Sequence, residues 1–125
     1  MSNPSTTSLA SRILVVDDDP DWREFLKISL EELGYQPFLA SSGEDALRWL
    51  STEACSVMLL DLHMPGMTGE DVVARLPRHE HAPRVVFLTA AQPHEVGNAL
   101  NSGPHYYLPK GAGRQELSLL LQSLQ

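Results

Sequence analysis

The sequence predicts one α/β domain with a doubly wound, five-stranded parallel sheet and five helices. The chain has 125 residues, of which 42% are apolar, and this suits a single compact core. Short apolar runs alternate along the chain with segments that have the periodicity of amphipathic helices. Several runs are apolar on both strand faces, which is typical of parallel strands covered by helices on both sides.

The first third of the chain is predicted to contain two strands separated by a helix. The first strand is 12–16, which reads Arg-Ile-Leu-Val-Val. Pro20 opens the helix, where its missing N–H costs nothing, and apolar residues then recur at helical spacing until Gly34. The second strand is 35–40, and Pro37 indicates a position near the edge of the sheet because proline cannot donate to a strand ladder.

The middle of the chain continues the alternation. Ser41 and Glu44 have the spacing of a capping box, so the second helix is predicted to begin there. A fourfold apolar run at 57–60 is the third strand. A turn rich in Gly and Pro leads into a third helix that is expected to end at Pro77, and 84–88 is the fourth strand.

The last part of the chain completes the pattern with a short helix at 93–100, a fifth strand at 105–108 and a final helix after Gly113. Pro109 again indicates an edge strand. An order that puts both Pro-bearing strands at the edges is 2-1-3-4-5, the flavodoxin-like arrangement. Open sheets of this type bind their ligands beyond the carboxyl ends of the strands, between strands 1 and 3.

Composition excludes several classes of function. Acidic residues outnumber basic ones by 16 to 9, and the formal net charge is −7. We therefore expect no nucleic-acid binding by this domain, because such surfaces neutralise phosphates with Lys and Arg. Cys55 is the single cysteine, so it forms neither an internal disulfide nor a zinc cluster, which is compatible with a reducing cytosol.

Residues 1–11 are expected to be a flexible tail, and 12–125 the folded domain. The tail lacks the basic start and apolar centre of a secretory signal. The longest apolar runs have about four residues, against about 20 for a membrane span, so we expect a cytoplasmic protein with no membrane segment. The apolar face of the last helix still continues at Gln125, which looks like an N-terminal domain of a longer protein, although a free-standing one stays open.

Five polar side chains lie within two residues of the ends of the predicted strands: Asp17, Asp18, Asp61, Thr89 and Lys110. The carboxyl ends of parallel strands meet at one edge of the sheet, so these side chains are expected to converge. Clustered carboxylates repel one another unless a cation lies between them, and oxygen ligands without His or Cys favour Mg²⁺. A carboxylate can accept a phosphoryl group there while Mg²⁺, Lys and Thr neutralise its oxygens.

Each of these residues has an ordinary structural explanation when taken alone. An acidic run before a helix usually caps it, and a lone Thr or Lys at a strand end usually means little. Asp61 is harder to explain, because a carboxylate directly after four apolar residues is a poor choice for structure alone. A calcium loop starting at Asp17 is excluded, since Trp22 and Ile28 occupy the positions that need Gly and Glu, and no Gly-rich nucleotide loop is present.

The motifs at these positions resemble the receiver domains of two-component response regulators, including the single-domain chemotaxis response regulators. The resemblance covers nearly the whole chain from Arg12 onward. Four segments carry it: 13–18 (Ile-Leu-Val-Val-Asp-Asp), 59–69 (Leu-Leu-Asp-Leu-His-Met-Pro-Gly-Met-Thr-Gly), 87–90 (Phe-Leu-Thr-Ala) and 107–110 (Tyr-Leu-Pro-Lys).

The resemblance implies a Mg²⁺ site and a phosphoacceptor. Asp61 is the implied phosphoacceptor, which takes a phosphoryl group from the phosphohistidine of a histidine kinase. Asp18, Asp61 and the backbone carbonyl of His63 are the implied direct ligands of Mg²⁺. Asp17 acts directly or through water, and Asp19 is the alternative ligand in the triple-Asp run.

The resemblance also implies a conformational switch. Thr89 is similar to the hydroxyl residue that moves to meet the phosphoryl group, Tyr107 to the aromatic that follows it, and Lys110 to the lysine that pairs with phosphoryl oxygens. One departure is Gly111, because the family usually has Pro after this Lys, often across a cis bond; the backbone around Lys110 is therefore left open.

The implied function is a phosphorelay switch whose surface at helix 4, strand 5 and helix 5 has two states. Expected partners are a sensor histidine kinase or phosphotransfer protein, and an effector protein or an output domain beyond Gln125; a homodimer of the phosphorylated form is also allowed. The domain catalyses its own phosphorylation and slow hydrolysis, so it is an enzyme only in a weak sense. Two alternatives are a phosphorylation-independent interaction module and a flavin-binding electron carrier, and the acidic loop after strand 1 disfavours flavin.

Overall fold

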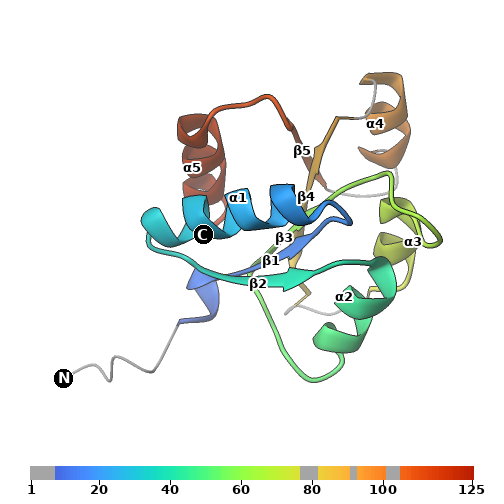
Figure 1. Ribbon diagram of the computed structural model, residues 1–125, viewed down its shortest axis with the longest axis horizontal. Coiled ribbons are helices and arrows are strands. Elements are labelled where there is room, and N and C mark those ends of the chain that lie inside the picture. Colours follow the sequence, from blue (N-terminus) through green and yellow to red (C-terminus); the bar gives the residue numbers. More distant parts are fainter. Residues whose placement is uncertain (1–7, 77–81, 91–92, 101–104) are drawn as a thin grey trace.

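The computed structural model describes residues 8–76, 82–90, 93–100 and 105–125, and it confirms the predicted fold class. The strands form one parallel sheet in the predicted order β2-β1-β3-β4-β5, with the two Pro-bearing strands at its edges (Figure 1). The strands are β1 (Arg12–Val16), β2 (Gln36–Ala40), β3 (Val57–Leu60), β4 (Arg84–Thr89) and β5 (Tyr106–Pro109). The helices are α1 (Pro20–Glu32), α2 (Gly43–Leu50), α3 (Gly69–Ala74), α4 (Pro93–Leu100) and α5 (Arg114–Ser123).

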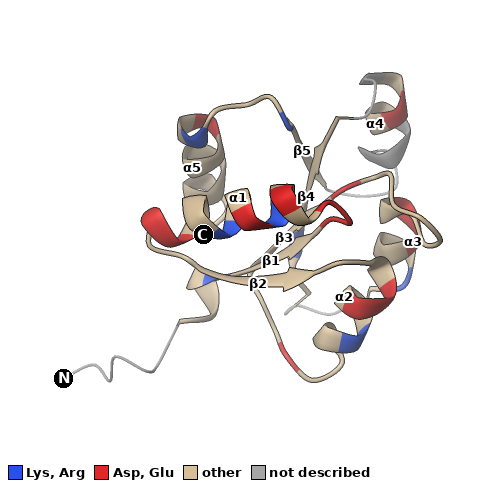
Figure 2. Ribbon diagram, in the orientation of Figure 1, with Lys and Arg blue, Asp and Glu red and all other residues tan. Residues whose placement is uncertain are grey.

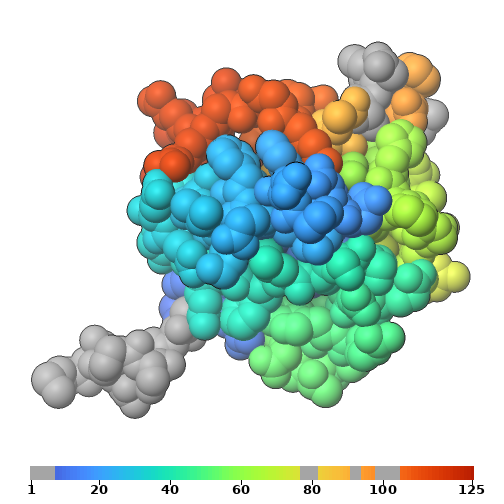
Figure 3. Space-filling model, in the orientation of Figure 1, coloured from blue at the N-terminus to red at the C-terminus, as the bar shows by residue number. Residues whose placement is uncertain are grey.

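Helices cover both faces of the sheet, so the core has two layers. Side chains alternate along β1: Leu14 and Val16 pack with α2, α3 and α4, while Ile13 and Val15 pack with α1 and α5. All four residues are buried, which explains why the strand is apolar throughout. Figure 3 shows α1 and α5 side by side. Residues of both helices, with Leu88 of β4 and Leu108 of β5, line a small hollow.

The start of α2 differs by one residue from the prediction. Ser42, and not Ser41, is the N-cap, and its Oγ accepts a hydrogen bond of 3.1 Å from the backbone N–H of Asp45. Ser41 is engaged elsewhere, because its Oγ donates a hydrogen bond of 2.9 Å to Oδ2 of Asp45. A Cβ on Gly43 would lie 2.7 Å from Cγ2 of Val72 in α3. The buried glycine therefore allows α2 to approach α3 closely.

The remaining differences concern element ends. Helix α3 starts with a capping box between Thr68 and Asp71 and ends at Ala74; Pro77, its predicted end, lies outside the described residues. Within the predicted tail, Leu9–Ser11 form a 3-10 helix, and residues 1–7 lie outside the described part. Among the described helices, none has the length and apolar character needed to cross a bilayer.

Candidate functional site

The register of the sheet brings the polar strand ends together. Val16 of β1 pairs with Leu60 of β3, so the residues that follow them, Asp17 and Asp61, leave the sheet at the same level. Thr89 ends the adjacent strand β4 beside Pro109 of β5. Figure 2 shows the acidic segments after β1 and β3 meeting at this edge, which confirms the predicted location of the cluster.

Three carboxylates lie close enough to share one cation. Oxygens of Asp17, Asp18 and Asp61 all lie within 4.8 Å of one another. Asp17 and Asp61 are only 2% and 6% exposed, whereas Asp18 is exposed. Burial, together with the negative charge of Asp61, raises the pKa of Asp17 despite its hydrogen bond to Lys110. These hard oxygen donors fit Mg²⁺, which takes few protein carboxylates and keeps several waters.

Both carboxylate oxygens of Asp61 have partners. Its Oδ1 accepts a hydrogen bond of 2.6 Å from Oγ1 of Thr89 and a longer one, 3.4 Å, from the backbone N–H of His63. Its Oδ2 faces Nζ of Lys110 at 3.4 Å. Asp61 is therefore held between a hydroxyl, a backbone N–H and an ammonium group, all of which stabilise negative charge.

Lys110 lies closer to Asp17 than to Asp61. Its Nζ is 2.7 Å from Oδ2 of Asp17. Partial burial lowers the pKa of Lys110, but the hydrogen bond to Asp17 and the charges of both carboxylates outweigh it, and the net shift is upward. Lys110 therefore stays protonated, and from the end of β5 its ammonium bridges Asp17 after β1 and Asp61 after β3.

The three consecutive aspartates, Asp17 to Asp19, have different structural roles. Asp19 is the N-cap of α1, and its Oδ1 accepts hydrogen bonds from the backbone N–H groups of Asp21 and Trp22 at 3.0 and 3.5 Å. Oδ1 of Asp17 accepts from the N–H of Asp19 at 2.9 Å, which turns the loop. Asp19, the alternative ligand, is therefore engaged as a cap and lies outside the group of three carboxylates.

The loop after β3 is shaped by Gly69. Its N–H donates to the carbonyl of Leu62 at 3.0 Å. A Cβ at this position would lie 2.5 Å from the carbonyl oxygen of Asp61 and 3.0 Å from Cα of Leu62. Only glycine lets the start of α3 approach the backbone of Asp61 this closely, so Gly69 supports the geometry of the site.

The backbone around Lys110 resolves the question left by Gly111. No described peptide bond is cis, so the Lys110–Gly111 bond is trans. The N–H of Lys110 donates to the carbonyl of Thr89 at 3.1 Å, and that of Ala112 donates to the carbonyl of Pro109 at 2.9 Å. Pairing with β4 and this tight turn position the lysine without a proline after it.

Tyr107 and His63 lie at the border of the site. Tyr107 is half-buried on β5, where it pairs with Phe87 and packs against the core layer under α2, α3 and α4. The exposed His63 contacts Glu95 of α4, with 2.5 Å between Nε2 and Oε2. This pair links the loop after Asp61 to α4.

Sequence reasoning missed two contacts at the site. Arg23 donates from Nη1 to the carbonyl oxygen of Asp17 at 2.7 Å, which fixes the loop after β1. Helical spacing gives no signal for this contact, because Asp17 is six residues before Arg23 and lies outside α1. The ring of Trp22 lies 5.3 Å from Nζ of Lys110. Helical spacing suggested only a core position for Trp22.

Comparisons with known sequences identify the family of this chain. The family model for the response regulator receiver domain matches residues 13–122. An uncharacterised 14.6 kDa protein of Leptolyngbya boryana is 36% identical over 113 residues, which is 88% of this chain and 86% of the relative. The transcriptional regulatory protein KdpE of Mycobacterium tuberculosis is 34% identical over 111 residues, which is 89% of this chain but only 49% of KdpE. The chain thus spans about half the length of KdpE.

Solved structures show the same architecture. The response regulator protein TrrA from Thermotoga maritima, solved in complex with Mg²⁺-BeF, superposes with a TM-score of 0.81 at 31% identity. The superposition covers 92% of this chain and 99% of TrrA. With a family match that runs from β1 into α5 and the expected acidic edge in place, the chain belongs to the receiver domains of two-component response regulators.

Proposed function

We propose that the domain is a phosphoacceptor switch in which Asp61 takes a phosphoryl group from the phosphohistidine of a sensor kinase or a phosphotransfer protein. One observation carries this proposal: a nearly buried Asp61 lies between the hydroxyl of Thr89 and the ammonium of Lys110, beside two further carboxylates. The hydroxyl and the ammonium can stabilise phosphoryl oxygens, and the carboxylates can hold a cation. The Mg²⁺-BeF complex of TrrA supports a similar ligand here.

The transfer is a displacement at phosphorus. A carboxylate oxygen of Asp61 attacks the phosphorus atom, the P–N bond breaks, and its electron pair leaves on the imidazole nitrogen, which takes a proton from solvent. Mg²⁺ held by Asp17, Asp18, Asp61 and the carbonyl of His63 would neutralise charge on the carboxylates and the phosphoryl oxygens. Hydrolysis reverses the modification, because water attacks the phosphorus, releases inorganic phosphate and restores the carboxylate.

The chain's own residues would convert the modification into a change of surface. Lys110 pairs with a phosphoryl oxygen, and Thr89 transfers its hydrogen bond from Asp61 to another one. Tyr107, on the neighbouring strand, then follows Thr89 and alters the face formed by α4, β5 and α5. We propose that a cytoplasmic effector, a second copy of the domain or a covalently attached output domain reads this face; KdpE is an example of a transcriptional regulator about twice as long.

The proposal is tested with Mg²⁺ and a small acyl phosphate as donor. Intact-mass measurement should show one phosphoryl increment on the native protein and none on Asp61→Asn. Asp21→Asn is the matched control, because Asp21 is an exposed acid near the site that lies outside the carboxylate cluster. Equal labelling of Asp61→Asn contradicts the assignment of the acceptor. A native protein that stays unlabelled favours the phosphorylation-independent interaction module, and a coloured preparation would reveal flavin.

A further inference from the structure

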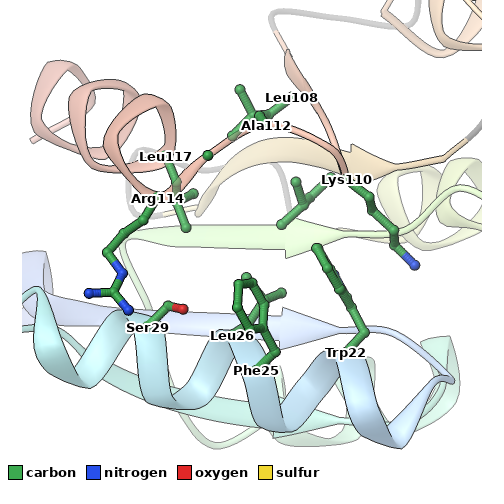
Figure 4. A pocket seen from close by; sticks show the side chains of 11 residues that line it. Trp22, Phe25, Leu26, Ser29, Leu108, Lys110, Ala112, Arg114 and Leu117 are labelled. Atoms are coloured by element: carbon green, nitrogen blue, oxygen red, sulfur yellow. The ribbon is translucent and has the colours of Figure 1, made fainter.

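Lys110 has a third neighbour besides its two carboxylates. Its Nζ lies 2.7 Å from Asp17, 3.4 Å from Asp61 and 5.3 Å from the centre of the Trp22 ring. This last distance is within the range of a cation–π interaction, in which the face of an aromatic ring attracts a cation. Figure 4 shows Trp22 rising from α1 toward the lysine at the end of β5.

The structure holds the Trp22 ring in place independently of Lys110. Its backbone N–H donates to Oδ1 of Asp19 at the start of α1, and its ring packs in a tilted arrangement against the Phe25 ring, with 5.3 Å between the centroids. The ring also packs against the core layer under α1 and α5, and it lines the hollow beside Leu88 and Leu108. The indole N–H is buried without a hydrogen-bond partner among the described residues, so packing orients the ring.

We propose that Trp22 is a positioning residue that keeps the ammonium of Lys110 at the phosphoacceptor site; this inference rests on the proposed function. Lys110 is close to Asp17, and Asp17 is also a proposed Mg²⁺ ligand. Mg²⁺ and the ammonium of Lys110 compete for that carboxylate. Filling the metal site would therefore weaken the ion pair between Lys110 and Asp17. The ring of Trp22 is uncharged and does not bind the metal. It can therefore still attract the ammonium of Lys110 and hold it near Asp61 when the metal is bound.

The lysine needs such a support because its side chain is flexible. Four rotatable bonds separate its ammonium from the backbone, and a glycine follows it in the chain. Lys110 is 21% exposed, so solvent competes for the charge. Trp22 covers the side of the lysine that faces α1, which limits the positions that the ammonium can adopt.

The first test needs neither metal nor phosphoryl group. The chain has two tryptophans, so Trp49→Phe leaves Trp22 as the only one. In this background, Lys110→Met should change the fluorescence emission of Trp22, because it removes a charge beside the indole. Lys27→Met is the control and should leave the emission unchanged, since Lys27 pairs with Glu31 on α1. An emission spectrum that Lys110→Met does not alter overturns the contact.

The second test measures the rate at which the protein is labelled by a small acyl phosphate with Mg²⁺. Trp22→Leu should be labelled roughly three- to tenfold more slowly, as expected for a partly desolvated cation–π contact. Trp22→Phe keeps an aromatic face and should stay within about twofold of the native rate. Trp49→Leu, which removes the distant tryptophan that packs on Phe38, should match the native protein.

A combined variant separates positioning from a merely structural role. In a Lys110→Met background, Trp22→Leu and Trp22→Phe should have the same labelling rate, because the lysine through which Trp22 acts is absent. A Trp22→Leu defect that persists in this background overturns the inference, and so does a native rate in Trp22→Leu alone. Failure of the proposed function is seen differently, as a native protein that takes no phosphoryl group at all.

Discussion

Thr89 donates a hydrogen bond of 2.6 Å from its Oγ1 to Oδ1 of Asp61, and both side chains are almost completely buried. The bond joins the ends of the adjacent strands β3 and β4. It orients the carboxylate of Asp61 before any metal or phosphoryl group arrives, and it leaves Oδ2 facing Lys110. The carboxylate of Asp61 is thus preorganised for its two partners, the hydroxyl and the cationic group.

Thr89→Ala should lower the free energy of unfolding by about 2 kcal/mol, because it leaves a buried carboxylate without one of its donors. Thr89→Ser keeps the hydroxyl and should lose clearly less. Urea denaturation of the metal-free protein measures both values. Thr52→Ala is the control on an exposed threonine. Equal losses for the Ala and Ser variants would show that the methyl group, and not the hydrogen bond, stabilises the fold.

Mg²⁺ should stabilise the native protein against heat. At a concentration ten times its dissociation constant, a ligand of the folded state adds about 1.4 kcal/mol to the free energy of unfolding. Asp18→Asn and Asp61→Asn should lose this gain, while Asp21→Asn should keep it, because only the first two belong to the carboxylate cluster. Thermal unfolding with and without MgCl₂ at constant ionic strength makes the comparison. A full shift in Asp61→Asn would exclude this metal site.

Asp17→Asn should stabilise the metal-free protein at pH 7. The pKa of Asp17 is raised in the folded state above its ordinary value of 3.8, so the fold favours the protonated form. The ionised carboxylate therefore destabilises the fold fully above the raised pKa, and this effect disappears as the pH falls toward 3.8. The advantage of Asp17→Asn should shrink over the same range in urea denaturation. A less stable variant at pH 7 would mean that the ion pair with Lys110 outweighs burial.

Gly69→Ala should destabilise the domain by about 2 kcal/mol, because the added methyl group would collide with backbone that cannot move cheaply. The nearest atoms are the carbonyl oxygen of Asp61 and Cα of Leu62. The variant should also slow labelling of Asp61, since the loop after β3 must shift. Gly97→Ala is the control: its site on α4 has open space, and alanine favours helix there. A Gly69→Ala protein as stable as the native one would contradict the close approach.

Much of the fold followed from local patterns. The runs at 12–16 and 57–60 are apolar on both faces, and only a strand covered on both sides of a sheet buries such a run completely. Pro37 and Pro109 placed their strands at the edges, because a residue without an N–H cannot serve in the middle of a sheet. These signals depend on neighbouring residues, so the sequence carries them directly.

The gathering of the carboxylates was also predictable. In a parallel sheet every strand ends at the same edge, so Asp17, Asp61 and Thr89 converge once the strand order is known. Their identity then limits the chemistry to hard cations and phosphoryl groups. The sequence by itself therefore determined the fold class, the edge that carries the site and the residue types available there.

Only the tertiary structure decided which contacts each of those residues makes. Asp19 caps α1 while Asp17 turns inward, and Ser42 rather than Ser41 caps α2. The ring of Trp22 meets Lys110, a residue at the far end of the domain's sequence. Each of these outcomes depends on ångström-scale contacts between segments that are remote along the chain, and such contacts exist only after the helices have packed on the sheet.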